Sequence, residues 1–317
     1  MLERAGTAAA RISAPSVGDP RRRALLQYGL AVLIFGFLIA FVARQWSALP
    51  DFDWRFEPAW LALSLVCIAL FYAVQGELWR VIVAWLGEHI DARPARAVWG
   101  KSLLARYVPT NMLLVVGRVV MAQRYGVPKR VTLASIVYEL GLGVGVALML
   151  GAYFLIDLPA LAEQPARFAV LAVVPAILAV FHPRIFGPLT AFALRKLGRE
   201  ALPRTLGFGR VLVLCLGYAC GYVLIGVGLY AFAAALHPLD LADLPYVAAS
   251  YPVAFCVAVV TFIVPSGLGT RDAALATAMA AVLAGAVATA IAVAFRIVQT
   301  AVELAYVALV TALERRG

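Results

Sequence analysis

Eight ionisable side chains lie within or at the ends of long apolar segments of this sequence. On insertion scales, a charged residue at the centre of a membrane helix costs about 2.5–3.5 kcal/mol, so it faces the protein interior or a wet cavity. These residues are therefore the candidates for binding or transport chemistry. They are Glu77, Arg80, Arg118, Glu139, Arg271, Asp272, Arg296 and Glu303.

Arg118 and Arg271 are the strongest of these candidates, because each lies in a segment that a regular membrane helix would not contain. The stretch VPSGLGTRDA places a proline and two glycines, Gly267 and Gly269, just before Arg271. A guanidinium matches phosphate oxygens, and a glycine turn at the start of a helix offers backbone N–H groups to the same anion. The pattern predicts an anion site, most naturally for phosphate. A structural ion pair of Arg271 with Asp272 and its neighbours is the alternative.

Two further pairs of charges are open to both a functional and a structural interpretation. Arg296 and Glu303 are seven residues apart, which places them on one face of a helix, and we expect that face to point inward. They either support a binding site or only hold the bundle together. Glu77 and Arg80 either belong to the same group of functional charges or extend to the membrane interface, as long charged side chains do.

The composition around these residues is that of an integral membrane protein. Of the 317 residues, 64% are hydrophobic and 14% are charged, whereas soluble domains average about 45–50% and 25%. We therefore predict an all-α, polytopic membrane helix bundle, with residues 21–317 as a single domain after a disordered cytoplasmic tail at residues 1–20. The predicted full spans are 25–43, 59–79, 131–156, 168–183, 211–236 and 286–312.

Two other apolar regions, 102–121 and 246–284, do not have the pattern of simple spans. The first has basic residues at both ends and Pro109 near its centre, which predicts a re-entrant hairpin or two half-helices entering from the cytoplasm. In the second, the limb after Arg271 has about 13 residues, or roughly 20 Å, which is short of a core about 30 Å thick. We expect the two broken elements to enter from opposite faces, as in transporters with a midplane site.

The basic residues orient the chain. Of 27 Lys and Arg residues, 21 fall in segments that would share one side, and the opposite loops hold three. The positive-inside rule then makes both termini cytoplasmic, in a multi-pass protein of the bacterial inner membrane. The net charge of +10 is accounted for by this orientation and by attraction to anionic lipid. No base-reading or stacking pattern accompanies it, so we predict no nucleic-acid partner.

The sequence lacks the arrangements on which conventional enzymes and metal sites depend. The three histidines are far apart, the four cysteines lie in apolar runs, and there is no Walker loop or G-x-S-x-G motif. We therefore predict no catalytic residue, no metal and no cofactor. Tryptophans such as Trp79 and Trp85 are interpreted as interface belts.

Four blocks of sequence together form a family pattern: ARYVPTNMLLVVGRVVMAQRYGVP, ASIVYELGLGV, VPSGLGTRDAAL and FRIVQTAVEL. Over roughly residues 60–312 the chain resembles the transmembrane domain of the lysylphosphatidylglycerol synthase/flippase family. That domain also occurs alone and beside glycosyltransferases that use lipid-linked sugars. The motif positions fall on Tyr107, Pro109, Gly117, Arg118, Glu139, Pro265, Gly267, Gly269, Arg271, Asp272 and Arg296.

The chain departs from the family pattern at two positions. Thr110 and Asn111 stand where the family commonly has Gly-Lys, and Asp272 stands where it has Glu. The loss of the lysine removes a phosphate partner. The aminoacyl-transfer domain is not among these residues, so we do not expect this chain alone to make lysylphosphatidylglycerol.

The leading hypothesis is a lipid flippase-like protein that binds a phosphate-bearing headgroup, from a phospholipid or a polyprenyl-phosphate-linked lipid, and moves it between leaflets. Arg118 and Arg271 would hold the phosphate. Glu139 and Asp272 would balance these arginines when the site is empty, or contact a cationic headgroup. Arg296 would support the site, and Gly267 and Gly269 would allow close approach. Secondary candidates are Tyr107, Pro109, Asn111 and Glu303.

Two alternatives belong to other classes. The chain could be a membrane subunit that presents a lipid-linked substrate to a separate transferase. It could also be a structural or regulatory membrane protein whose inner charges only fix packing. The expected partners are membrane lipids, with a transferase and a second copy of the chain as further candidates.

Overall fold

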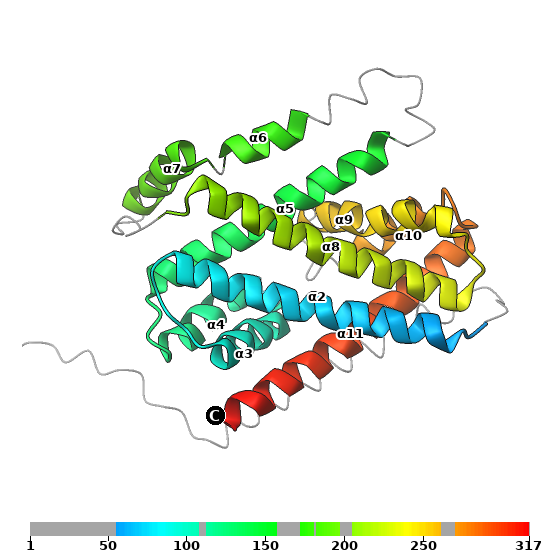
Figure 1. The fold of residues 1–317 in the computed structure, drawn as a ribbon, viewed down its shortest axis with the longest axis horizontal. Coiled ribbons are helices and arrows are strands. Elements are labelled where there is room, and N and C mark those ends of the chain that lie inside the picture. Colours follow the sequence, from blue (N-terminus) through cyan, green and yellow to red (C-terminus); the bar gives the residue numbers. More distant parts are fainter. Residues whose placement is uncertain are drawn as a thin grey trace, which may run out of the picture. The chain divides into compact units, whose positions relative to one another are not determined.

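The computed structural model describes residues 55–107, 112–156, 172–180, 182–196, 205–260 and 270–316. All of them belong to one compact unit, Gln45–Gly317. Within these ranges all regular structure is helical (Figure 1), which confirms the all-α membrane bundle. The predicted tail at residues 1–20 and the predicted span 25–43 lie outside the described residues, and the single-domain assignment stays a prediction.

Four of the predicted spans are confirmed as helices long and apolar enough to cross a membrane. These helices are α2 (Pro58–Trp85), α5 (Lys129–Ile156), α8 (Phe208–Leu236) and α11 (Gly285–Arg315). Each contains a long and mostly apolar segment, and the helical form satisfies every backbone group inside the segment, as a membrane requires. Pro58 suits the first turn of α2, where a missing N–H costs nothing.

Helices α2 and α8 lie side by side and run in opposite directions (Figure 1). The N–H of Glu57, just before α2, donates to the carbonyl of Ala235 at the end of α8, at 3.0 Å. At the other end, Arg210 near the start of α8 donates through Nη1 to the carbonyl of Trp85, at 3.3 Å. Both helix ends are therefore fixed in register, and the shared face forms part of the core.

The first broken region is two short helices. Helix α3 (Ala92–Leu103) continues into the 3-10 turn η1 (Leu104–Tyr107), and α4 (Met112–Gln123) follows. Each α-helix has 12 residues, or about 18 Å, too short for a core about 30 Å thick. Helix α3 packs on α2 and α11, and α4 packs on α5. Helix α4 lies inside the predicted region 102–121 except for its last two residues, whereas α3 begins ten residues before that region. The break at Pro109 lies outside the described residues, and entry from the cytoplasm stays a prediction.

The second broken region differs from expectation in its first limb. Helix α9 (Leu244–Val260) follows the 3-10 turn η4 (Leu241–Asp243), and together they reach the length of a candidate span over Leu241–Val259. Helix α9 continues through Pro252 without interruption. The second limb, α10 (Thr270–Met279), has 10 residues, or about 15 Å, and is short as predicted. Both limbs pack on each other, and α9 also contacts α5 and α8.

The predicted span 168–183 is only partly described. Helix α6 (Val173–Val180) covers eight of its residues, and α7 (Pro183–Lys196) follows in the segment interpreted as a basic loop. Phe186 of α7 packs on Tyr138 of α5, with ring centroids 4.4 Å apart. The assignment of 168–183 as a full span stays a prediction.

A polar contact fastens the first broken region to the end of the last helix. Lys101 of α3 forms an ion pair with Glu314 of α11, and Tyr125 donates to the other oxygen of Glu314 at 2.6 Å. The hydrogen bond to Glu314 raises the pKa of Tyr125 above its ordinary value. Helices α3 and α11 are thus joined at the end of the bundle where α11 terminates.

Candidate functional site

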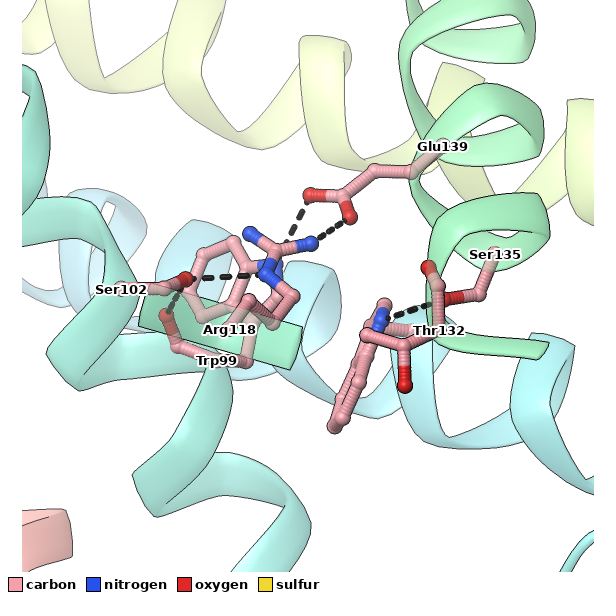
Figure 2. A network of polar contacts seen from close by, with 7 residues as sticks. Trp99, Ser102, Arg118, Thr132, Ser135 and Glu139 are labelled. Atoms are coloured by element: carbon pink, nitrogen blue, oxygen red, sulfur yellow. Dashed lines mark hydrogen bonds and ion pairs between the residues drawn. The ribbon is translucent and has the colours of Figure 1, made fainter. Parts of the chain in front are cut away.

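The side chain of Arg118 is the centre of a buried polar cluster. It projects from α4 and is 1% exposed. Its Nε donates to Ser102 Oγ at 2.9 Å, and its Nη1 donates to Glu139 Oε2. Figure 2 shows Ser102 and Glu139 reaching the guanidinium from α3 and α5, on two different sides. Three helices that follow one another in the chain, α3, α4 and α5, therefore position one charge.

Aromatic side chains also contact the charged groups around Arg118. Trp99 of α3 donates from Nε1 to Glu139 Oε1 at 2.8 Å, so both oxygens of the carboxylate accept a hydrogen bond. The guanidinium carbon of Arg118 lies 5.6 Å from the ring centroid of Trp79, within the range of a cation–π contact. We call Trp79, Trp99, Ser102, Arg118 and Glu139 the Arg118 cluster.

The partners of Arg118 are themselves held in place. Trp79 donates from Nε1 to Ser135 Oγ at 2.9 Å, and Ser135 donates to the carbonyl of Thr132 at 2.7 Å. Ser102 donates to the carbonyl of Trp99 at 2.6 Å. These contacts, visible in part in Figure 2, fix the donors and acceptors around the charge. The cluster is preorganised, as a binding site for a charged group requires.

Tyr218 of α8 lies near this cluster and was not identified from the sequence. It is 2% exposed, and its hydroxyl has no hydrogen-bond partner among the described residues. The preceding residue of α8, Gly217, lies against Leu78 of α2, which is next to Trp79 in the sequence. A tyrosine in a membrane helix gives no signal in the sequence that distinguishes a site from packing.

Arg271 belongs to a second cluster. It is the second residue of α10, is 6% exposed, and donates from Nη2 to Gln299 Oε1 at 2.5 Å. Gln299 donates in turn to the Tyr251 hydroxyl at 2.7 Å, and the guanidinium carbon lies 4.8 Å from the Tyr251 ring centroid. We call Tyr251, Arg271 and Gln299 the Arg271 cluster. Its neutral members, from α9 and α11, were not predicted.

Arg296 and Glu303 are buried, as their spacing predicted. They are 5% and 2% exposed on the inward face of α11, where Gln299 also lies. The Tyr72 hydroxyl of α2 donates to Glu303 Oε2 at 2.7 Å. Asp272 is 5% exposed. The expectation that these charges face the interior is therefore confirmed.

A row of aromatic rings joins the two clusters. Tyr251 of the Arg271 cluster lies 6.4 Å from Phe71, Phe71 lies 5.3 Å from Tyr72, and Tyr72 lies 6.5 Å from Trp99 of the Arg118 cluster, all between ring centroids. Tyr306 of α11 stacks on Tyr72 at 5.9 Å. The hydrogen bonds of the described residues thus place Arg118 and Arg271 in separate clusters, and rings of α2 lie between them.

Other predicted residues fall elsewhere or outside the description. Glu77 accepts from Arg80 at 2.5 Å and from Arg96 at 3.1 Å, in a half-exposed group that joins α2 to α3. Gly117 lies on α4, and Tyr107 ends η1.

The interpretation of Trp79 as an interface residue is wrong, because its ring is fully buried under Arg118. Predicted residues outside the described ranges are Pro109, Thr110, Asn111, Pro265, Gly267 and Gly269.

The chemistry of both clusters would allow each of them to bind an anion. Each cluster offers a buried guanidinium with aromatic support, and a guanidinium forms its strongest hydrogen bonds with carboxylate or phosphate oxygens. Among the described residues, no group of three or more His, Cys, Asp or Glu side chains could hold a metal ion. In the Arg118 cluster the anion position is filled by Glu139.

The chain matches the model of a known protein family. The model of a family described as the lysylphosphatidylglycerol synthase TM region matches residues 26–306, which is most of the chain. No curated protein matches it.

Proposed function

We propose, because the chain belongs to the family of the lysylphosphatidylglycerol synthase transmembrane region, that this multi-pass membrane protein binds and translocates a phosphate-bearing lipid headgroup. The lipid is a phospholipid or a polyprenyl-phosphate-linked lipid. The single observation that carries the proposal is the almost complete burial of Arg118 among helices α2, α3, α4 and α5. A buried cation that is held by several elements marks a site of function in a membrane protein.

Binding would exchange one anion for another. When the site is empty, Glu139 balances the charge of Arg118. An arriving phosphate would take the Glu139 position at Nη1, while Ser102 continues to hold Nε. The guanidinium would then lie beside an anion in both the empty and the loaded state, so it would never be buried without a counter-charge. Glu139, released, would contact a cationic part of the headgroup or the solvent that its partial exposure allows.

The Arg271 cluster would be a second position on the same route. Its guanidinium donates to the amide oxygen of Gln299 from α11, and a phosphate would bind as an additional acceptor there. Asp272 follows Arg271 in α10, and Arg296 lies one turn before Gln299 in α11. The aromatic row between the clusters would provide a smooth wall along which the headgroup passes from one arginine to the other.

The test compares two double variants in proteoliposomes that carry tail-labelled fluorescent phosphatidylglycerol. Arg118→Gln with Glu139→Gln removes both charges of the cluster and leaves neutral amides of similar size. We expect headgroup transfer, followed by bleaching from outside, to slow by about 10- to 100-fold, because a hydrogen bond to a charged group contributes about 1.5–3 kcal/mol. The thermal unfolding temperature should change little, since no buried charge is left alone.

The control is Glu77→Gln with Arg80→Gln, which makes the same exchange in an ion pair outside both clusters. This variant should transfer lipid at the wild-type rate. The proposal is rejected if the Arg118/Glu139 double variant is folded and transfers lipid as fast as the wild type.

A second function is favoured by the family description, which is that of the membrane region of a synthase. In that case the clusters would hold a lipid-linked substrate for a separate transferase. The two functions separate in the same assay: a presenting subunit binds the lipid and co-purifies with a soluble enzyme, but it does not transfer the headgroup alone. For either function we propose the bacterial inner membrane, with both termini cytoplasmic.

A further inference from the structure

The hydroxyl of Tyr218 is a buried polar group without an evident structural purpose. It has no hydrogen-bond partner among the described residues, although its side chain is 2% exposed. Leaving a buried hydroxyl unsatisfied costs a folded protein stability, and a hydrocarbon ring of the same shape would avoid that cost. Phenylalanine would therefore be the more stable residue at this position, and the hydroxyl calls for a functional explanation.

Tyr218 lies at the depth of the Arg118 cluster. It is the eleventh residue of α8, and Glu139 is the eleventh residue of α5. Each is therefore about 15 Å from the start of its helix. The Tyr222 hydroxyl of α8 donates to the carbonyl of Gly143 of α5 at 3.0 Å, and Tyr218 and Glu139 each lie four residues, about one helical turn, before these two partners.

The packing of α8 on α2 also brings Tyr218 toward Arg118. A Cβ added to the preceding residue, Gly217, would meet Leu78 Cδ2 of α2 at 2.5 Å. The residue after Leu78 is Trp79, whose ring lies beneath the guanidinium. Tyr218 thus lies at the depth of the Arg118 cluster. It belongs to α8, a helix that contributes no residue to the cluster as defined above.

We infer that the Tyr218 hydroxyl is an additional donor of this site, and that it hydrogen-bonds a phosphate oxygen held by Arg118. This inference rests on the proposed function. A phosphate offers more acceptor oxygens than the carboxylate it replaces, so a second donor is satisfied only when phosphate is bound. The hydroxyl would stabilise the lipid-bound state relative to the lipid-free state, in which Glu139 is paired with the guanidinium of Arg118.

The inference predicts opposite effects on stability and on binding. Tyr218→Phe should leave the thermal unfolding temperature of the empty protein unchanged or higher, and should weaken binding of short-chain phosphatidylglycerol about tenfold. Binding is followed by intrinsic fluorescence, since Trp79 and Trp99 belong to the cluster. The matched control is Tyr222→Phe, one turn further along α8. Its hydroxyl donates to the carbonyl of Gly143 at 3.0 Å, so its loss should lower the unfolding temperature and leave affinity unchanged.

Two results would overturn the inference while leaving the proposed function in place. One is a Tyr218→Phe protein that binds the lipid within twofold of wild type while Arg118→Gln with Glu139→Gln does not bind. The other is a Tyr218→Phe protein destabilised as much as Tyr222→Phe, which would show a structural partner. If wild type and the Arg118/Glu139 variant respond alike to the lipid, the proposed function itself fails.

Inorganic phosphate, titrated into the same three proteins, identifies the source of the oxygen. A tenfold loss for Tyr218→Phe with phosphate alone supports the inference with a free phosphate as ligand. The same loss seen only with the lipid supports it with the headgroup phosphate as ligand. Equal responses of wild type and Tyr218→Phe to both ligands reject it.

Discussion

The buried guanidinium of Arg118 is stabilised by contacts with side chains from several helices. A hydroxyl, a carboxylate and an indole ring each contact the guanidinium, so no single contact carries the whole energy. The same principle holds at Glu303, where the Tyr72 hydroxyl reaches a carboxylate that is 2% exposed. Truncating one partner of such a group costs more than the contact is worth, because the other partner stays buried.

We predict that Tyr72→Phe destabilises the protein. The hydroxyl donates to a buried carboxylate at 2.7 Å, so its removal should lower the free energy of unfolding by about 1–3 kcal/mol. Denaturant unfolding in detergent, followed by circular dichroism, measures the change.

Tyr306→Phe is the matched control, because Tyr306 stacks on Tyr72 but its hydroxyl has no partner among the described residues. The control should stay within about 0.5 kcal/mol of wild type. Equal losses in both variants would show that the rings, and not the hydrogen bond, carry the effect.

At the residue scale, charge was the useful signal in the sequence. Arg118, Arg271, Arg296 and Glu303 are conspicuous in apolar runs, and all four are buried. Ser102, Gln299 and Tyr251 were missed, since neutral polar residues are ordinary in membrane helices. The choice of Glu139 as the partner of Arg118 depends on how α4 packs on α5, and no local pattern contains that packing.

Among the elements, helix α8 determines how closely its neighbours approach. A Cβ at Gly226 would lie 2.8 Å from both the Cβ and the carbonyl oxygen of Ala248 in α9. The neighbouring atoms are helix backbone, which has no flexible end to move away. Membrane helices gain stability from such close contacts, because lipid offers no hydrophobic force to drive them together.

We therefore expect Gly226→Ala to separate α8 from α9 and to lower the free energy of unfolding by about 1–3 kcal/mol. Gly209→Ala, in the first turn of the same helix, is the control, since no atom lies within 4 Å of its added Cβ. The control should be neutral or gain up to about 1 kcal/mol from helix propensity. A loss in Gly209→Ala equal to that in Gly226→Ala would contradict the packing argument.

The elements were predictable where the apolar runs were long and simple. The ends of α5, α8 and α11 fall within three residues of the predicted 131–156, 211–236 and 286–312. Helix α9 was predicted less well, because the stretch VPSGLGTRDA led us to interpret the whole of 246–284 as one irregular region. A proline inside a membrane helix is tolerated when its neighbours satisfy the freed carbonyl, and the sequence does not say which neighbours these are.

At the scale of the whole molecule, the basic residues gather where helices begin and end on one side. Lys129 and Arg130 start α5, Arg210 lies in the first turn of α8, and Arg315 ends α11. Asp240 and Asp243 lie between α8 and α9. The helix directions in the structure therefore agree with a membrane orientation set by positive charge.

We predict the labelling pattern of single cysteines placed at these ends, in a variant whose four native cysteines are replaced by alanine. A membrane-impermeant maleimide should label Asp240→Cys and Ala284→Cys in intact cells. Arg130→Cys and Arg316→Cys should react only after the cells are made permeable, because positive charge retains these ends in the cytoplasm.

Mass shift after labelling measures the reaction, and Cys220 restored alone in a membrane helix serves as the unreactive control. Labelling of Arg130→Cys in intact cells would reverse the proposed orientation.

The length of the principal helices has a consequence for the host membrane. Helices α2, α8 and α11 contain 28, 29 and 31 residues, or about 42–46 Å each, so they exceed a hydrocarbon layer of about 30 Å. Such helices lean, or the surrounding lipid stretches to cover them, and either response has an energetic cost that grows with the mismatch. The acyl-chain length of the bilayer thereby becomes a variable in the folding of this protein, and a thicker membrane would suit it better than a thin one.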